Sequence, residues 1–276
     1  DLFLESVGSA DDEDQGDDSS VEVEDVDYLM PVLTCLAHCL QSSDYSSCMA
    51  IVEELLVKIV EKRRPTNREL QLLHKVLMSD DYYRDHRYDC SLIIERLIGL
   101  MSHTFVKDCD LMVSFGGRFQ CRSCRRFTGH QTHSAVCLQV VAKNKTTPTT
   151  TTTTLQTLLD DQYPNDRPML CAWCNSSNNR KRSYLTGVPG NTLFIHLQIA
   201  SIGTAVNIPQ CVQVLKSKFK RLVAVFGSDE YDTVAVWMRI HNGLWIRVTD
   251  SGIHYDEPED ILSDGRNCSV LVYKKN

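Results

Sequence analysis

Four cysteines in two Cys-x-x-Cys pairs are the residues whose type and spacing best suit chemistry. The pairs are residues 121–124, Cys-Arg-Ser-Cys, and residues 171–174, Cys-Ala-Trp-Cys. Each pair can present two thiolates at the end of a tight turn, and four thiolates suit the tetrahedral coordination of zinc. We expect one structural Zn²⁺ ion bound by Cys121, Cys124, Cys171 and Cys174, with no open position for a catalytic water. The alternatives are a redox-active pair or four core cysteines.

The two pairs are far apart in the chain, with residues 125–170 between them. This interval contains a threonine run, residues 146–154, which we interpret as part of a flexible insertion spanning 144–154. Loop closure entropy grows slowly with length, so the interval does not prevent the pairs from meeting. His130 and His133 follow the first pair and could compete as ligands, but the second pair already completes the coordination shell. We expect both, and His38, to be surface or loop histidines.

The composition of the chain limits the class of protein to which it can belong. The chain has 276 residues, 42% of them hydrophobic, and a formal net charge of −7. A sizeable globular core is expected, whereas a nucleic-acid partner is not, although residues 122–126 and 180–182 are locally basic. The acidic stretch 11–25 cannot bury enough apolar surface to order itself. No apolar run is long enough to cross a bilayer, so no membrane contact is expected.

The other cysteines indicate the compartment. Twelve cysteines are present, and four of them lie within apolar runs, where a free thiol behaves as a small hydrophobe: Cys35, Cys39, Cys137 and Cys268. A secreted disulfide framework would place its cysteines differently. We therefore expect a reducing, intracellular location, in cytoplasm or nucleus.

The predicted secondary structure that must position the cysteine pairs changes along the chain from helices to strands. Residues 28–103 have apolar side chains at helical spacing and predict about four helices, with Pro31 in an opening turn and Asp89 as an N-cap. Residues beyond 107 form short alternating runs that predict strands, apart from one short helix at 155–161. Helices first and strands after indicate an α+β fold without a parallel βαβ sheet.

Several segments, taken in order, carry a resemblance to a known family. They are residues 28–36 (Tyr-Leu-Met-Pro-Val-Leu-Thr-Cys-Leu), 88–94 (Tyr-Asp-Cys-Ser-Leu-Ile-Ile), 115–119 (Phe-Gly-Gly-Arg-Phe), 188–193 (Val-Pro-Gly-Asn-Thr-Leu), 193–197 (Leu-Phe-Ile-His-Leu), 243–250 (Gly-Leu-Trp-Ile-Arg-Val-Thr-Asp) and 270–273 (Val-Leu-Val-Tyr). Together with the cysteine pairs, this order resembles the ubiquitin-specific protease family of deubiquitinases.

The resemblance implies a papain-like right hand over residues 27–276, after an acidic, flexible segment at 1–26. Residues 27–110 would be a helical thumb, residues 111–185 zinc-bearing β fingers, and residues 186–276 a β palm. Ubiquitin or a ubiquitin-like protein would rest between fingers and palm. Other proteins of a larger complex are further expected partners.

The residues at the family's catalytic positions are the wrong ones. The nucleophilic cysteine of the family directly precedes the aromatic residue of the first helix, and here that position is Asp27. Counting from Arg239 and Trp245 places the histidine at Thr233 and the orienting residue at Thr249. A thiolate mechanism needs a thiol, an imidazole and a polar orienting group. The resemblance therefore implies an inactive member that acts as a binding or scaffolding module, with the three vacated positions lying together.

Two alternatives stay open at this point. An active but atypical cysteine isopeptidase could use Cys35 with His241 or His254. A zinc-finger module that binds nucleic acid would use the basic clusters, but the acidic total and the large helical half argue against it.

Overall fold

The computed structural model describes residues 26, 28–40, 51–79, 89–101, 110–142, 151–163, 171, 173–176, 185–200, 204–228, 234–240, 243–249, 251–265 and 268–275. Within these ranges, helices occupy the first part of the chain and strands most of the rest, so the predicted mixture of helix and strand is confirmed. In the same ranges, no helix combines the length and the hydropathy needed to cross a membrane.

The helical half consists of α1 (Leu29–Cys39), α2 (Ile51–Val60), α3 (Asn67–Leu77) and α5 (Cys90–Gly99). The predicted cap at Asp89 is confirmed, because its carboxylate accepts hydrogen bonds from the backbone N–H of Ser91 (2.9 Å) and Leu92 (3.3 Å). Pro31 lies in the first turn of α1, where no backbone hydrogen-bond donor is required. These local signals fix where the helices begin.

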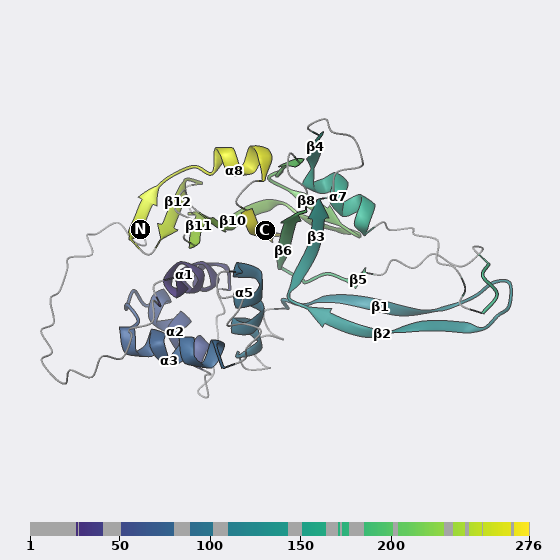
Figure 1. Cartoon of the computed structure of the whole chain (residues 1–276), viewed down its shortest axis with the longest axis horizontal. Helices are drawn as coiled ribbons and strands as arrows, with labels where there is room; N and C mark the ends of the chain where they lie inside the picture. The colour runs from purple at the N-terminus through teal and green to yellow at the C-terminus, as the bar shows by residue number, and fades with distance from the viewer. Residues whose placement is uncertain are drawn as a thin grey trace, which may run out of the picture.

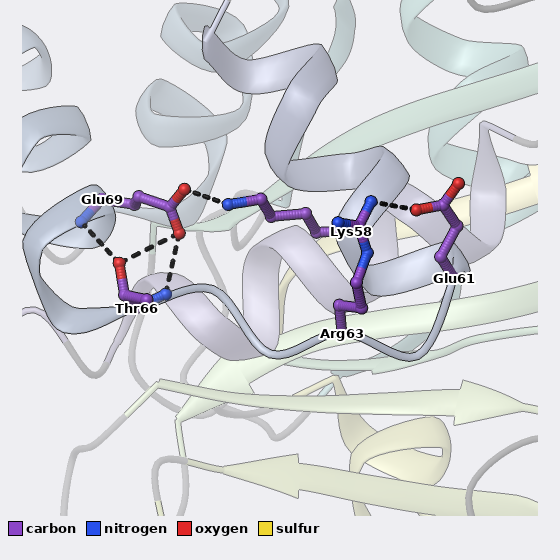
Figure 2. Close-up of polar contacts among 5 residues, drawn as sticks. All are labelled: Lys58, Glu61, Arg63, Thr66 and Glu69. Atoms are coloured by element: carbon purple, nitrogen blue, oxygen red, sulfur yellow. Dashed lines mark hydrogen bonds and ion pairs between the residues drawn. The ribbon is translucent and has the colours of Figure 1, made fainter. Parts of the chain in front are cut away.

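A second cap lies at the start of α3, and its carboxylate also contacts α2, as Figure 2 shows. Thr66 and Glu69 form a capping box at the start of α3, in which Glu69 accepts from the Thr66 backbone N–H at 2.9 Å. Lys58, near the end of α2, forms an ion pair with the same carboxylate. Next to it, Arg63 pairs with Glu61. One carboxylate therefore both starts α3 and connects it to α2.

The strands form one large sheet and three small ones. The seven-stranded sheet has the order β13-β12-β11-β10-β14-β6-β3. Its members are β3 (Cys137–Ala142), β6 (Thr192–Ile199), β10 (Arg221–Ser228), β11 (Val234–Arg239), β12 (Trp245–Thr249), β13 (Gly252–Tyr255) and β14 (Cys268–Lys274). The two-stranded sheets are β4 (Thr151–Thr154) with β7 (Thr204–Asn207), and β8 (Val212–Val214) with β9 (Ser217–Phe219).

Both faces of the central strands of the large sheet are buried. Along β14, Val270 and Val272 face the core shared with the helical half, while Leu271 and Tyr273 face a second core. The second core includes residues from α7 (Leu155–Gln162) and α8 (Glu259–Asp264). In Figure 1, α1, α2, α3 and α5 lie on one side of the sheet and α8 on the other. A strand covered on both faces needs apolar residues at successive positions.

One prediction about the strands holds in its main part and another is wrong. The large sheet is not a parallel βαβ sheet, because all its pairs are antiparallel except β3 with β6 at one edge. A second parallel pair, β4 with β7, forms a separate small sheet. Between β3 and β6 the chain passes through β4, α7, the second cysteine pair and β5 (Leu185–Gly187), which is a long crossover of the kind that parallel strands require. Residues 151–154 of the expected flexible insertion are ordered as β4, because threonine is a good strand former that finds a partner in β7.

Helix α7 covers the free edge of β3. The Gln162 side chain accepts from the Val141 backbone N–H (3.0 Å) and donates to the Val141 carbonyl (2.8 Å). Tyr163, next in sequence, donates its hydroxyl to the Gln139 carbonyl. A carboxamide bound in this way takes the place of a neighbouring peptide group. It therefore blocks strand addition at this edge.

A three-stranded arm carries the cysteine pairs. It consists of β1 (Val113–Gln120), β2 (Phe127–Ala135) and β5 (Leu185–Gly187), in the order β2-β1-β5. The β1–β2 register shifts between Phe115 and Gly117, and Gly116 there has a φ of 100°, which favours glycine. Figure 1 shows the arm extending away from the helices and the large sheet.

Candidate zinc site and the expected catalytic positions

The two cysteine pairs form turns of the same shape. In the first, Arg125 donates its backbone N–H to the Cys121 carbonyl at 2.9 Å; in the second, Asn175 donates to the Cys171 carbonyl, also at 2.9 Å. Arg125 and Asn175 both have positive φ, 57° and 55°. The first cysteine of each pair also donates its backbone N–H to the carbonyl of the residue two positions after the second cysteine. These bonds run from Cys121 to Arg126 (3.0 Å) and from Cys171 to Ser176 (3.1 Å). Equal spacing thus produces equal turns.

The four sulfur atoms converge. Cys121 Sγ lies 3.6 Å from Cys174 Sγ, and Cys124 Sγ lies 3.6 Å from Cys171 Sγ. All four lie within 4.8 Å of one another. A tetrahedral zinc ion with Zn–S bonds of about 2.3 Å separates its sulfurs by about 3.8 Å. The sulfur positions therefore fit one structural zinc ion, and the predicted ligand cluster is confirmed.

The backbone of the two turns favours the thiolate form of Cys121 and Cys171. The Cys124 backbone N–H donates to Cys121 Sγ at 3.5 Å, and the Trp173 N–H donates to Cys171 Sγ at 3.4 Å. The Cys124 N–H lowers the pKa of Cys121. Burial by itself would raise the pKa of Cys171, but the N–H groups of Trp173 and Cys174 and two neighbouring sulfurs lower it to about 6. The Ser176 N–H lowers the pKa of Cys174, but burial and the three neighbouring sulfurs raise it to about 12. Two of the four sulfurs are therefore favoured as the deprotonated ligands that a metal needs.

The surface of the two turns is polar and basic around one indole. Arg126 Cζ lies 5.1 Å from the centre of the Trp173 ring, a cation–π contact between the first turn and the second. The hydroxyls of Ser123 and Ser176 lie 2.8 Å apart and join the turns again. Of these contacts, the sequence shows only that the residues are present, because each one joins two distant segments.

The three histidines named from the sequence lie on α1 and β2 and not in loops. His38 is half-buried on α1, and its Nε2 lies 3.1 Å from the Arg239 carbonyl of β11, so the expected surface or loop position is wrong for this residue. His130 and His133 lie on β2, opposite Gly117 and Phe115, and the structure describes only their backbone. Among the side chains that the structure describes, the candidate cluster consists of the four cysteines.

Of the three expected catalytic positions, the structure describes one. Asp27 and Thr233 lie outside the described residues. Thr249 ends β12 and is 7% exposed. Its hydroxyl lies 2.8 Å from the Ser251 hydroxyl and donates to the Gly252 carbonyl at 3.4 Å. The threonine is therefore held within the turn that leads to β13.

The residues that flank the three positions share one core. Val26, Tyr28, Val234 and Val248 are all buried in the core between the helices and the large sheet. Helix α1 packs against β10, β11 and β12. Tyr28, which precedes α1, also places its hydroxyl 3.0 Å from Nδ1 of the buried His74 of α3, a contact that the helical periodicity did not indicate. That Asp27, Thr233 and Thr249 lie together stays a prediction.

The cysteines outside the zinc cluster are mostly core residues. Among those that the structure describes, Cys35, Cys39, Cys90, Cys137 and Cys268 are buried and Cys211 is exposed. Burial raises the pKa of the Cys35 thiol well above its ordinary value, and burial raises that of Cys90 to about 12. Cys35 Sγ lies 3.8 Å from Cys39 Sγ. The prediction that the cysteines within apolar runs belong to the core is confirmed.

Cys211 has a different setting. It lines an open cavity of about 420 Å³ between α7 and the β8–β9 pair. The other lining residues are Gln156, Leu159, Asp160, Tyr163, Val212, Gln213, Val214, Leu215 and Lys218. No histidine is among them, so this cavity offers its thiol no imidazole base.

Comparison with known proteins supports the fold. No protein-family model matches the sequence, and no curated protein matches it. Among solved structures, a chain of the SAGA DUB module of Ubp8, Sgf11, Sus1 and Sgf73 bound to monoubiquitin is similar, with a TM-score of 0.56 and 14% identity over 90% of this chain. A chain of the same module bound to ubiquitin aldehyde has a TM-score of 0.53 and 14% identity over 90% of this chain. A chain of a yeast SAGA DUB module with an Sgf73 mutant has a TM-score of 0.54 and 14% identity over 90% of this chain.

This protein spans only part of the chains that it resembles. It covers 66% of the chain in the monoubiquitin complex and 67% of that in the ubiquitin aldehyde complex. At this level of identity the likeness concerns the fold. The protein has a mixed α and β fold similar to that of a chain in the Ubp8 DUB module, and it has a four-cysteine site that fits zinc.

Proposed function

We propose that this protein is a catalytically inactive ubiquitin-specific-protease-like domain that serves as a protein-binding or scaffolding module. Its helical half, its zinc-bearing arm and its large sheet would correspond to the thumb (27–110), fingers (111–185) and palm (186–276) of the family. Strand β3 lies within 111–185 but belongs to the large sheet, so this part of the chain would belong to the palm. The fold and the four-cysteine site support this assignment. The choice of inactivity rests on the residues at the catalytic positions.

The start of α1 carries the proposal. The family's nucleophile precedes the aromatic residue that is Tyr28 here, and the sequence places Asp27 there. A carboxylate cannot replace the thiolate in this mechanism. The nearest thiol within α1, Cys35, is fully buried with a raised pKa. A buried thiol of this kind is protonated and out of reach of a substrate.

The one catalytic position that the structure describes agrees with loss of the mechanism. Thr249 bonds to Ser251 and Gly252 in its own turn, and a threonine hydroxyl cannot stabilise an imidazolium as a carboxylate does. His254, which the alternative hypothesis pairs with Cys35, is exposed on β13, whereas Cys35 is buried. These observations favour the inactive domain over the atypical isopeptidase.

The proposed partners follow from the fold. The similar chains belong to a module whose structures contain monoubiquitin or ubiquitin aldehyde together with Sgf11, Sus1 and Sgf73. We infer that this domain also works within a protein assembly, and that ubiquitin or a ubiquitin-like protein would contact both the arm and the large sheet. Loss of catalysis leaves such a surface free to hold a partner without cleaving it.

The test combines a reactive probe with a titration. Purified protein is incubated with ubiquitin that carries a C-terminal electrophile, beside an active deubiquitinase as positive control, and ubiquitin binding is measured by calorimetry. We expect no covalent adduct. Because the exposed Cys211 could react nonspecifically, the variant Cys211→Ser is included. Labelling of the unmodified protein that substitution of one buried cysteine abolishes would refute inactivity. Failure of ubiquitin and its relatives to bind would refute only the choice of partner.

A further inference from the structure

One tryptophan at the end of the arm is exposed although the fold buries the other two. Trp173 is 61% exposed, the largest value among the large hydrophobic residues that the structure describes as exposed. Trp237 and Trp245 are 4% and 6% exposed. Tryptophan and arginine are the residue types most enriched at energetically dominant positions of protein interfaces. The exposed indole is therefore a candidate contact residue.

The zinc turns hold this indole and a neighbouring guanidinium in fixed positions. The backbone N–H of Trp173 donates to the sulfur of Cys171. Arg126, stacked on the indole, has its carbonyl bonded to the Cys121 N–H at 3.0 Å. The backbone of both residues is therefore bonded to a zinc-ligand cysteine. A surface that is already ordered loses less conformational entropy when a partner binds.

The charge of this surface differs in sign from that of the chain. Arg122, Arg125 and Arg126 are all exposed, and segments 121–126 and 171–176 contain no Asp or Glu. The chain as a whole has a net charge of −7. The arm extends away from the rest of the molecule (Figure 1), and charges farther apart than about 8 Å are largely screened at physiological salt. The basic surface is therefore electrostatically separate.

The zinc site itself does not neutralise this surface. Two positive charges of zinc and four negative charges of thiolates leave the cluster negative by about two charges. Three arginines exceed that charge. Cys121 and Cys171 are 1% exposed, whereas Cys124 is half-buried and Cys174 is exposed, so the positive sign of the surface rests on the three arginines outnumbering the charge of the cluster.

We propose that the zinc tip, defined as residues 121–126 and 173–176, binds an acidic, extended segment of a partner protein. Carboxylates of that segment would pair with Arg122, Arg125 and Arg126, since a guanidinium binds a carboxylate through two parallel hydrogen bonds. An apolar or aromatic side chain would pack on Trp173. The proposal goes beyond the proposed function, because it concerns the outer end of the arm and does not depend on ubiquitin or on catalysis.

A nucleic acid is the less favoured partner. Nonspecific affinity for a phosphate backbone grows with the number of cationic groups that contact it, and it falls steeply with salt. Three arginines neutralise few phosphates. A long polyanion that reached past the tip would approach a body whose net charge is negative. A short acidic peptide meets the tip alone.

The experiment uses the full chain and a fluorescence signal from one residue. Acrylamide quenches an exposed indole far more than a buried one, so quenching reports on Trp173 and hardly on Trp237 or Trp245. The protein is titrated with a synthetic tryptophan-free peptide of glutamates interrupted by phenylalanine. The same peptide with glutamine in place of glutamate is the neutral control, and an oligothymidylate of equal length tests the nucleic acid. We expect saturable protection from quenching by the acidic peptide alone.

Variants then place the binding on the tip. Trp173→Ala removes the fluorophore, so affinities of all variants are measured by calorimetry. We expect Trp173→Ala and Arg126→Ala each to weaken peptide binding about tenfold or more. Arg68→Ala, at an exposed arginine of α3, serves as the matched control and should leave the affinity unchanged. Zinc content is measured for each variant, and one ion per chain shows that the tip is intact.

Three results of the ligand titrations would overturn the proposal. They are absence of saturable binding by the acidic peptide, equal binding of the glutamine peptide, and tighter binding of the oligothymidylate. Equal loss of affinity in Arg68→Ala would also overturn it, because the effect would then reflect total charge and not the zinc tip.

Discussion

The contact between Gln162 and Val141 allows a quantitative prediction about how the large sheet is protected. The substitution Gln162→Ala deletes a carboxamide that makes two hydrogen bonds, of 3.0 and 2.8 Å, to the backbone N–H and carbonyl of Val141. Each such bond contributes about 0.5–1.5 kcal/mol net, and a buried group left unpaired costs more. Val141 is half-buried, so water can reach it in part. We expect a loss of about 2 kcal/mol in the free energy of unfolding.

The same helix offers a matched control. Gln156 also bonds to the backbone of one residue twice: it accepts from the Gln213 N–H at 2.8 Å and donates to the Gln213 carbonyl at 2.9 Å. Its amide donates in addition to the exposed Asp160 carboxylate at 2.9 Å. Gln213 is exposed, so water can replace the lost carboxamide. Gln156→Ala should therefore cost less than about 1 kcal/mol. Alanine favours the helix at least as much as glutamine does, and helix propensity would not produce a loss in either variant.

Urea denaturation followed by far-ultraviolet circular dichroism gives both free energies. For a chain of this size, a loss of about 2 kcal/mol corresponds to a fall in Tm of roughly 4–8 °C. Hydrogen exchange supplies a local readout, because the Val141 amide should lose protection in Gln162→Ala and keep it in Gln156→Ala. Equal effects of the two substitutions would refute the argument from burial. A neutral Gln162→Ala with an unprotected Val141 amide would refute the contact itself.

Three further predictions concern the zinc site, a charged cap and a buried hydroxyl. Cys171→Ser should abolish binding of one zinc per chain and lower the Tm, since metal affinity contributes to folding of the arm; Cys211→Ser is the control, and full zinc content in Cys171→Ser would contradict the ligand assignment. Glu69 has its pKa lowered to about 2, first by Lys58, so its contribution is present above the unfolded pKa of about 4.3 and is lost as pH falls toward 2. In urea titrations, Glu69→Gln should therefore be less stable than the native protein at pH 6 and equal to it near pH 2; a constant difference would contradict the linkage. Tyr28→Phe deletes the hydrogen bond to a buried histidine of α3 and should cost about 1–2 kcal/mol in the free energy of unfolding, whereas an unchanged value would show that water replaces the hydroxyl.

Local features of the fold were predictable because their causes lie within a few residues. The N-cap at Asp89 and the short helix that the structure shows as α7 follow from side chains next to the affected backbone. The two turns of the zinc site also depend on local spacing, which explains why the ligand residues could be named in advance. The wrong result for residues 151–154 has the opposite cause, since that segment is ordered by pairing with Thr204–Asn207, some fifty positions away.

The sequence by itself determined the order of helices and strands, the identity of the four candidate zinc ligands and the absence of a cysteine at position 27. These properties depend on residue type and on short spacing. Only the tertiary structure decided that β3 pairs in parallel with β6, that Gln162 closes the outer edge of β3, and that Trp173 faces solvent while Trp237 and Trp245 are buried. The physical reason is that strand partners and side-chain exposure depend on which distant segments come together, and hydrophobic periodicity carries no information about partners.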